Sequence, residues 1–163
     1  MARLPDRFDL LVRKARECRD TARQADYVLG ALAGLKEWHF LNVGTREAPQ
    51  AAKTQIGTDL CLLVYSDISR IAELFQEGGR AQNPQKKEPL PVITISTAAA
   101  MAWCVKCRMG LLVNPGEDSA LVPFAQVENF QAEWSQRGGR QASGFWIPNM
   151  TTEEEDFWQE HGL

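Results

Sequence analysis

The stretch that decides the fold is residues 60–75, LCLLVYSDISRIAELF, where an uncharged apolar run passes directly into a helical pattern. The run 60–65 has the length and uniform hydrophobicity of a strand that is buried on both faces. Ser66 and Asp67 are residue types that begin helices, because their side-chain oxygens accept hydrogen bonds from the first free backbone N–H groups. The apolar residues that follow recur at helical spacing: Ile68, Ile71, Ala72, Leu74 and Phe75. The stretch therefore predicts a strand followed at once by a helix.

On the N-terminal side of this unit, the sequence predicts two helices and a further strand. Apolar residues at helical spacing favour one helix from a cap at about Asp6 to about Arg19, and another over about 22–36. Residues 38–43, WHFLNV, combine aromatic and β-branched types and are typical of a strand. The polar residues 44–59 are expected to form a connection.

On the C-terminal side, strands and helices continue to alternate. Residues 78–91 are rich in Gly, Pro and Lys and predict a long loop. After this loop we expect a strand over 92–95 and then a helix that begins at a cap at Ser96 or Thr97, runs to Cys107 and is closed by Gly110. The next elements are two strands, over 111–113 and 120–122, which are joined by a turn at Asn114, Pro115 and Gly116. A helix over 126–134 follows. This alternation, with one hairpin-like turn, predicts a single α+β domain in which helices pack on a mixed β-sheet of about five strands.

Length and composition agree with one globular domain. The chain has 163 residues, of which 44% are hydrophobic and 24% are charged, close to the average for folded proteins. A formal net charge of −3 argues against a dedicated nucleic-acid-binding protein. The sequence has no run of 18 apolar residues, and residues 1–9 lack the apolar stretch of a secretion signal. We therefore expect a cytoplasmic protein that binds neither membranes nor nucleic acids.

Charge and composition divide the chain into a domain over 1–134 and a C-terminal strap over 135–163. Residues 117–163 carry a net charge of −7, whereas residues 1–46 carry +3. A threonine at 151 or 152, with a glutamate three positions later, predicts a capping box at the start of a short acidic helix. The favoured interpretation is that the strap packs on the domain's own core through two aromatic pairs, while exchange between copies or binding to a partner protein are the alternatives. These pairs are Phe145 with Trp146 and Phe157 with Trp158.

The pair Cys104 and Cys107 is the sharpest local pattern, because C-x-x-C occurs in redox dithiols and as half of a zinc site. Redox dithiols of the thioredoxin type lie at a helix N-terminus, where the helix dipole lowers the thiol pKa. This pair is instead expected at the C-terminal end of a helix. A zinc site would need further ligands, but Cys18 and Cys61 are distant in sequence and His39 is expected within a strand. Structural thiols are the favoured interpretation, with redox and metal-binding roles as alternatives.

No other pattern indicates catalysis. The sequence contains no G-x-S-x-G, Walker A, H-E-x-x-H or G-x-G-x-x-G motif. The acidic run 153–156 lacks the ligand spacing of an EF-hand and suits a helix N-terminus, where the helix dipole stabilises negative charge. We therefore predict no catalytic residues, no cofactor and no metal site.

Three stretches carry a further signal: YVLGALAGLKEWHFLNV over 27–43, LCLLVYSDISRIAELF over 60–75, and AMAWCVKCRMGLLVNPGEDSALVPFAQVENF over 100–130. Together they resemble the N-terminal domain of the SseB family, named for enhanced serine sensitivity and also labelled type III secretion SseB-like. The resemblance spans about residues 25–134, roughly two-thirds of the chain. It implies a compact α+β domain with no established enzymatic activity.

The first functional hypothesis is a non-enzymatic domain that acts by binding another protein, in a regulatory or secretion-associated assembly. A homodimer formed through the strap is one version of this hypothesis. An alternative is a thiol-redox or metal-binding protein that uses Cys104 and Cys107, and a third is a small-ligand sensor with a pocket between sheet and helices. Besides the loop 78–91, the candidate interaction surface comprises Asn114, Pro115, Gly116, Phe145, Trp146, Phe157 and Trp158.

Overall fold

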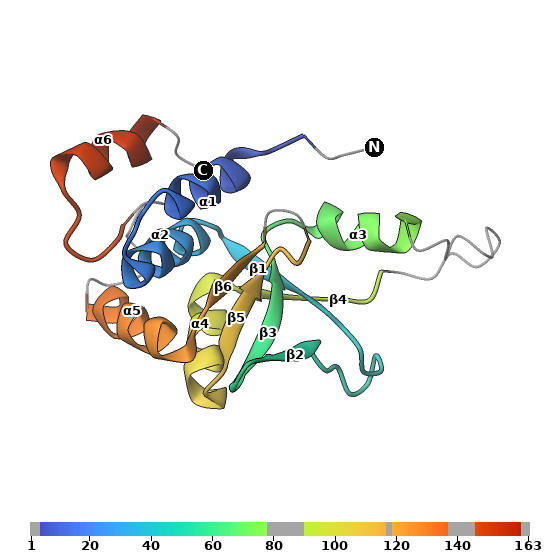
Figure 1. Cartoon of the computed structure of the whole chain (residues 1–163). Coiled ribbons are helices and arrows are strands. Elements are labelled where there is room, and N and C mark those ends of the chain that lie inside the picture. Colours follow the sequence, from blue (N-terminus) through green and yellow to red (C-terminus); the bar gives the residue numbers. More distant parts are fainter. Residues whose placement is uncertain (1–3, 78–89, 117–118, 137–145, 161–163) are drawn as a thin grey trace.

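The structure of the protein, a computed structural model, describes residues 4–77, 90–116, 119–136 and 146–160 (Figure 1). The prediction of an α+β domain is confirmed, because helices pack on one mixed β-sheet. The described elements, in chain order, are α1 (Arg7–Arg16), α2 (Thr21–Ala33), β1 (Glu37–Leu41), β2 (Lys53–Ile56), β3 (Asp59–Tyr65), α3 (Ile68–Glu77), β4 (Val92–Ser96), α4 (Thr97–Cys107), β5 (Gly110–Val113), β6 (Ala120–Val122), α5 (Phe124–Gln136) and α6 (Thr152–Glu160).

The sheet has the strand order β4-β1-β3-β5-β6, and β2 pairs with β3 beside this path. The β3–β5 pair is parallel, whereas the pairs of β1 with β3, β1 with β4, β2 with β3 and β5 with β6 are antiparallel. The parallel pair requires a long crossover, and the chain makes it through α3, β4 and α4. Strands β4 and β6 lie at the two ends of the path, so β6, the last of the described strands, is an edge strand.

The expectation that residues 44–59 form only a connection is wrong for β2. Lys53 lies opposite Leu62, and Ile56 lies opposite Asp59, in the antiparallel pair with β3. Gly57 has a φ of 61°, the left-handed conformation that a tight turn between two strands requires. This strand is held by backbone pairing with β3, and its own residues, KTQI, carry too little hydrophobicity to predict it.

Helices α2, α4 and α5 cover one face of the sheet, and α1 packs on α2. In Figure 1, α1, α2 and α5 stand to the left of the strands. Cys61 and Tyr65 on the other face of β3 are also buried, which agrees with the prediction of a strand buried on both faces. The side chains that the sheet contributes to the core under the helices include Trp38, Phe40, Leu62, Val64, Leu111 and Val113.

The predicted caps at the starts of α1 and α4 are confirmed. Asp6 and Asp9 form a capping box, in which each carboxylate accepts a hydrogen bond from the other's backbone N–H at 2.9–3.0 Å. The guanidinium Nη2 of Arg70 on α3 donates to both carboxylates, at 3.0 Å to Asp6 and 2.7 Å to Asp9. The cap of α1 therefore also fixes the position of α3. Ser96 caps α4 by accepting a hydrogen bond from a backbone N–H.

Gly110 does not close α4 as predicted. The helix ends at Cys107 and is capped by Arg108, whose φ of 54° is left-handed, and Gly110 is the first residue of β5. A Cβ atom at Gly110 would lie 2.7 Å from the carbonyl oxygen of Val122 on β6. Glycine is needed there because the two backbones approach too closely for a side chain.

Candidate functional site

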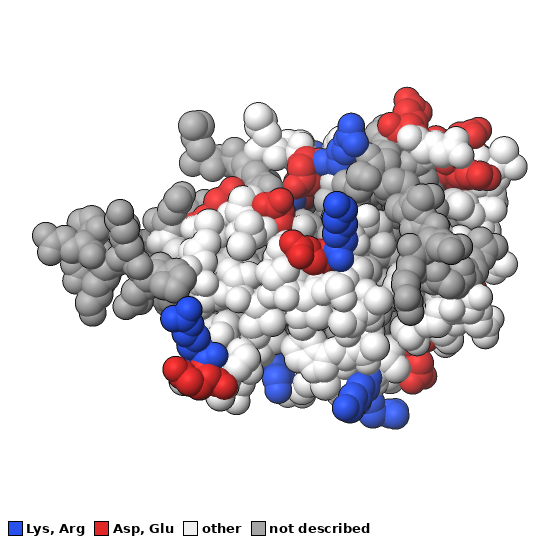
Figure 2. All heavy atoms as spheres, turned by 180° about the vertical axis from the view of Figure 1, so that it is seen from behind, with Lys and Arg blue, Asp and Glu red and all other residues white. Residues whose placement is uncertain are grey.

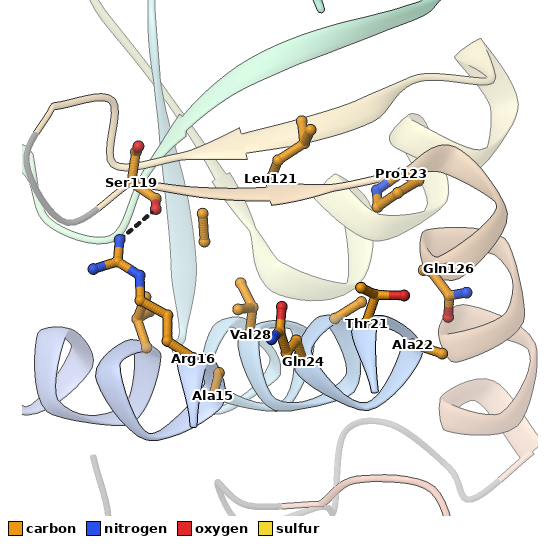
Figure 3. A pocket seen from close by; sticks show the side chains of 13 residues that line it. Ala15, Arg16, Thr21, Ala22, Gln24, Val28, Ser119, Leu121, Pro123 and Gln126 are labelled. Carbon is orange, nitrogen blue, oxygen red and sulfur yellow. Dashed lines mark hydrogen bonds between the residues drawn. The ribbon is translucent and has the colours of Figure 1, made fainter. Parts of the chain in front are cut away.

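A cavity of about 390 Å³ opens between β6 and the α1–α2 pair, and we call it the edge groove (Figure 3). Figure 3 shows Arg16 and Ser119 at one end and Pro123 and Gln126 at the other. The groove lies between the sheet and the helices at the edge of the fold. Its lining residues are Val12, Ala15, Arg16, Thr21, Ala22, Gln24, Ala25, Val28, Ser119, Ala120, Leu121, Pro123 and Gln126.

Small side chains on facing elements leave this space open. Ala15 on α1 and Ala25 on α2 are buried at its floor, and Ala120 on β6 faces the same cavity. The Nη2 of Arg16 donates a hydrogen bond to the carbonyl oxygen of Ser119 at 2.7 Å, so it ties α1 to the residue just before β6. The groove therefore has one end closed by a guanidinium.

The chemistry of the lining suits binding rather than proton transfer. Among the described residues that line the groove, Arg16 is the one with an ionisable side chain, and these residues include no carboxylate, imidazole, thiol or phenol. General acid–base catalysis needs such a group within hydrogen-bond reach of the reacting atom. Small-molecule and peptide sites in proteins are commonly apolar with a few polar groups that set orientation. Here the polar groups include Gln24 and Gln126.

The residues of the predicted turn lie in the connection between β5 and β6, and the first of them has a structural role. Asn114 is buried, with a left-handed φ of 48°. Its Oδ1 accepts a hydrogen bond from the backbone N–H of Ser66 at 2.9 Å, and its Nδ2 donates to the Ser66 hydroxyl at 3.0 Å. Asn114 therefore joins the ends of β5 and β3 and is not on the surface. Pro115 is half-buried and Gly116 is exposed.

The aromatic residues of the strap divide between core and surface. Trp146 is 7% exposed and packs against Phe130 of α5, with ring centroids 5.4 Å apart. Phe157 is half-buried, and the Lys14 ammonium lies 5.3 Å from its ring centroid. Phe145 and the side chain of Trp158 lie outside the described residues. The structure thus places Trp146 inside the molecule, as the prediction of a strap packed on its own core requires.

A carboxylate on α6 fastens the strap to α2. Glu154 accepts hydrogen bonds from the Arg23 guanidinium at 2.5 and 3.2 Å and from the Tyr27 hydroxyl at 2.6 Å. The Arg23 guanidinium also donates to the backbone carbonyls of Pro148 and Asn149. Burial alone would raise the pKa of Glu154, but these hydrogen bonds outweigh burial and lower it to about 2.

The predicted capping box at the start of α6 is also confirmed. The backbone N–H of Glu154 donates to the Thr151 hydroxyl at 3.1 Å, and the Glu154 carboxylate accepts from the Thr151 backbone N–H at 3.0 Å. One glutamate therefore caps its own helix and binds α2 at the same time. The capping role could be read from residue spacing, whereas the contact with α2 could not.

The cysteine pair lies where the sequence placed it, at the C-terminal end of α4. Cys104 is fully buried, and burial raises the pKa of its thiol to about 12, while Cys107 is exposed. A thiol with this pKa stays protonated near neutral pH and is a poor nucleophile. All four cysteines are free, and the described residues contain no cluster of His, Cys, Asp or Glu that could hold a metal ion.

Comparisons with protein-family models, with curated proteins and with solved structures found no match to this chain. Among the described residues, no helix combines the length and the apolar character needed to cross a membrane.

Proposed function

We propose that this protein is a non-enzymatic binding domain whose edge groove holds an extended segment of a partner protein. The observation that carries the proposal is the position of the groove, which runs beside the edge strand β6. In the described part of the chain, β6 pairs with β5 alone. The outer edge of a strand offers main-chain donors and acceptors with which an extended peptide can pair.

The lining determines the chemistry of the proposed ligand. The floor of Ala15, Ala25 and Val28 accommodates small or medium-sized apolar side chains. Arg16 is the one charged residue among the described residues of the lining, and a positive charge favours an acidic group at that end of the segment. We therefore expect an extended segment with alternating apolar residues and one carboxylate. The resemblance to the SseB family supports a role without catalysis, and a regulatory or secretion-associated assembly is the proposed setting.

Peptide display against the full chain tests this proposal. Selected peptides are expected to be apolar with an acidic residue, and a fluorescent copy should bind the wild-type chain saturably. Thr21 is exposed at the first position of α2 and lines the groove, so Thr21→Trp should block it and weaken binding by about tenfold or more. Ala102→Trp is the matched control, because Ala102 is exposed on α4 and does not line the groove. Equal binding by both variants would contradict the proposal.

One observation favours a second candidate, a small-molecule ligand. The cavity volume of about 390 Å³ falls within the range of roughly 300–1,000 Å³ that is typical of ligand pockets. Such a ligand would bind between Val28 and Ala120 without pairing along β6. A fragment screen by protein NMR distinguishes the two functions: fragments that shift the resonances of the groove, in the absence of any selected peptide, would favour the small molecule.

A further inference from the structure

We propose that this protein associates with a second copy of itself through the edge strand β4, so that the two sheets join into one continuous sheet. In this arrangement the two β4 strands run antiparallel about a twofold axis at Thr94. Strand β4 lies at the end of the sheet opposite to β6. The inference therefore concerns a different surface from the edge groove and does not depend on the proposed function.

The hydrogen bonds between β1 and β4 show which backbone groups of β4 face away from the sheet. At one end of this pair, the backbone N–H of Asn42 donates to the carbonyl oxygen of Pro91 at 2.8 Å. Hydrogen-bonded positions alternate along an antiparallel pair, so Ile93 and Ile95 are also bonded to β1. The residues of β4 that direct their backbone groups outward are therefore Val92, Thr94 and Ser96.

Some of these outward groups are already used within the chain. The N–H of Val92 donates to the carbonyl oxygen of Leu90 at 2.9 Å. The carbonyl oxygen of Ser96, the N-cap residue of α4, accepts the first hydrogen bond of that helix. Among the described strands, β4 pairs with β1 alone. The groups left for a further strand are the carbonyl oxygen of Val92, the N–H and carbonyl oxygen of Thr94, and the N–H of Ser96.

The order of these groups along β4 is complementary to itself. With the twofold axis at Thr94, the two Thr94 residues donate to and accept from each other. Val92 then lies opposite Ser96 of the second copy, so a carbonyl oxygen meets an N–H on each side of the axis. All four groups gain a partner in this way, and the group that each copy has already used is matched by a used group opposite. A second β4 is therefore the complementary strand.

The side chains of β4 allow this pairing, because none of them brings like charges together. The strand, VITIS, contains neither a charged residue nor a proline, two features that commonly protect edge strands from pairing. In the twofold arrangement, Ile93 lies beside Ile95 of the second copy on one face of the joined sheet. The two Thr94 side chains meet on the other face. Cross-strand pairs of this kind stabilise adjacent strands.

A tryptophan beside β4 adds apolar surface to the proposed interface. Trp103 of α4 is half-buried, and its ring lies edge-on to that of Phe40 on β1, with the centroids 5.3 Å apart. Phe40 is opposite Ile93 in the sheet register, so Trp103 lies over the β1–β4 pair. Tryptophan is among the residues that contribute most to the stability of protein interfaces.

The exposed surface of α4 carries little charge. Ala98, Ala99 and Ala102 are exposed, and the cations Lys106 and Arg108 lie at the C-terminal end of the helix. Figure 2 shows mostly uncharged atoms in the region where the half-turn from Figure 1 places α4. Because α4 follows β4 directly and packs on it, the twofold axis brings both α4 helices to the same face of the joined sheet. Their alanines then permit a close approach without repulsion between like charges.

Charged substitutions at Thr94 test the inference, because Thr94 is exposed and meets itself across the proposed axis. In sedimentation velocity, the wild-type chain should show a monomer–dimer equilibrium within a range of about 1 µM to 1 mM. Thr94→Lys and Thr94→Glu each place two like charges at the axis and should weaken the dimer at least about tenfold. An equal mixture of the two variants should form a heterodimer, because opposite charges then meet.

Gln55→Lys and Gln55→Glu are the matched controls, because Gln55 is exposed on β2, outside the proposed interface. Both controls should dimerise as the wild type does. The inference is overturned if the wild-type chain is monomeric throughout the concentration range, or if the Gln55 variants weaken the dimer as much as the Thr94 variants. A mixture of the Thr94 variants that is no more dimeric than either variant alone would also overturn it.

Cysteine cross-linking tests the register independently of charge and of any variant that fails to fold, which circular dichroism would reveal. Thr94→Cys places two thiols at a Cα separation of about 5.5 Å, which a disulfide can span. Ser96→Cys is the control, because Ser96 is exposed on the same strand but its two copies lie too far apart for a disulfide. Under mild oxidation, peptide mass spectrometry should find a link between the two positions 94. Its absence, or equal linking at position 96, would overturn the inference.

Discussion

Replacing Glu154 by glutamine should loosen α6 from α2 at neutral pH and have little effect in acid. Glutamine keeps the size of the side chain and can still accept a hydrogen bond from the Tyr27 hydroxyl, but it removes the charge that binds Arg23. Because most described side chains of α6 are exposed, the change should act on the opening of this helix rather than on unfolding of the core.

The magnitude follows from the pKa of Glu154. A pKa of about 2 in place of the ordinary 4.5 corresponds to at most about 3.5 kcal/mol at neutral pH, since one pKa unit is equivalent to about 1.4 kcal/mol. The side chains of Glu154 and Arg23 are 15% and 22% exposed, and solvent screens a pair in this position. We therefore expect the free energy of opening α6 to fall by about 1–2 kcal/mol in Glu154→Gln.

The sign of the pH dependence is fixed by the direction of the pKa change. Docking lowers the pKa of Glu154, so its stabilisation is fully present above about pH 4.5 and is lost as the pH falls toward 2. Glutamine does not titrate. The difference between wild type and Glu154→Gln should therefore be largest at pH 7 and should shrink steadily below pH 4.5.

Hydrogen exchange of the α6 backbone amides, followed by NMR between pH 7 and pH 3.5 and corrected for intrinsic rates, measures these opening free energies. Glu155→Gln is the control, because it removes the same charge from an exposed position one residue away. The reasoning is refuted if wild type and Glu154→Gln open equally at pH 7, or if their difference stays constant down to pH 3.5.

Three further predictions concern the fold and the thiols. Gly110→Ala should destabilise the protein by about 1–3 kcal/mol in urea unfolding, because the new Cβ meets a β6 carbonyl oxygen at 2.7 Å; unchanged stability would contradict the close approach. Asn114→Ala should cost about 2–4 kcal/mol, through two lost hydrogen bonds to Ser66 and left-handed backbone strain, and Asn114→Gly should be less harmful because glycine relieves the strain. A maleimide reagent should label Cys107 in the folded protein and leave Cys104 unlabelled, as peptide mass spectrometry would show; equal labelling would favour the dithiol hypothesis.

Local sequence patterns predicted most elements, because each pattern consists of the residues whose own interactions stabilise that element. The stretch 60–75 became β3 and α3, and the alanine-rich segment before Cys107 became α4. The missed strand β2 shows the limit of this approach. Its residues KTQI are paired with β3 through the backbone, and backbone pairing leaves no hydropathy signal on the paired strand. The close approach of β5 and β6 at Gly110 was also missed, because a glycine that follows a helix is ordinarily interpreted as the end of that helix.

In the candidate sites, the properties that the sequence determined and those that the tertiary structure decided are separated more clearly. The amino-acid sequence alone determined that the strap is acidic, that it contains a capped helix beginning at Thr151 or Thr152, and that the C-x-x-C pair ends a helix, because these properties depend on neighbours within one turn of chain. The tertiary structure alone decided that Trp146 is buried, that Glu154 meets Arg23 across more than a hundred residues, and that small side chains of α1, α2 and β6 leave an open groove. Burial, ion pairs and cavities belong to surfaces that only folding brings together, and their residues carry no common pattern along the chain.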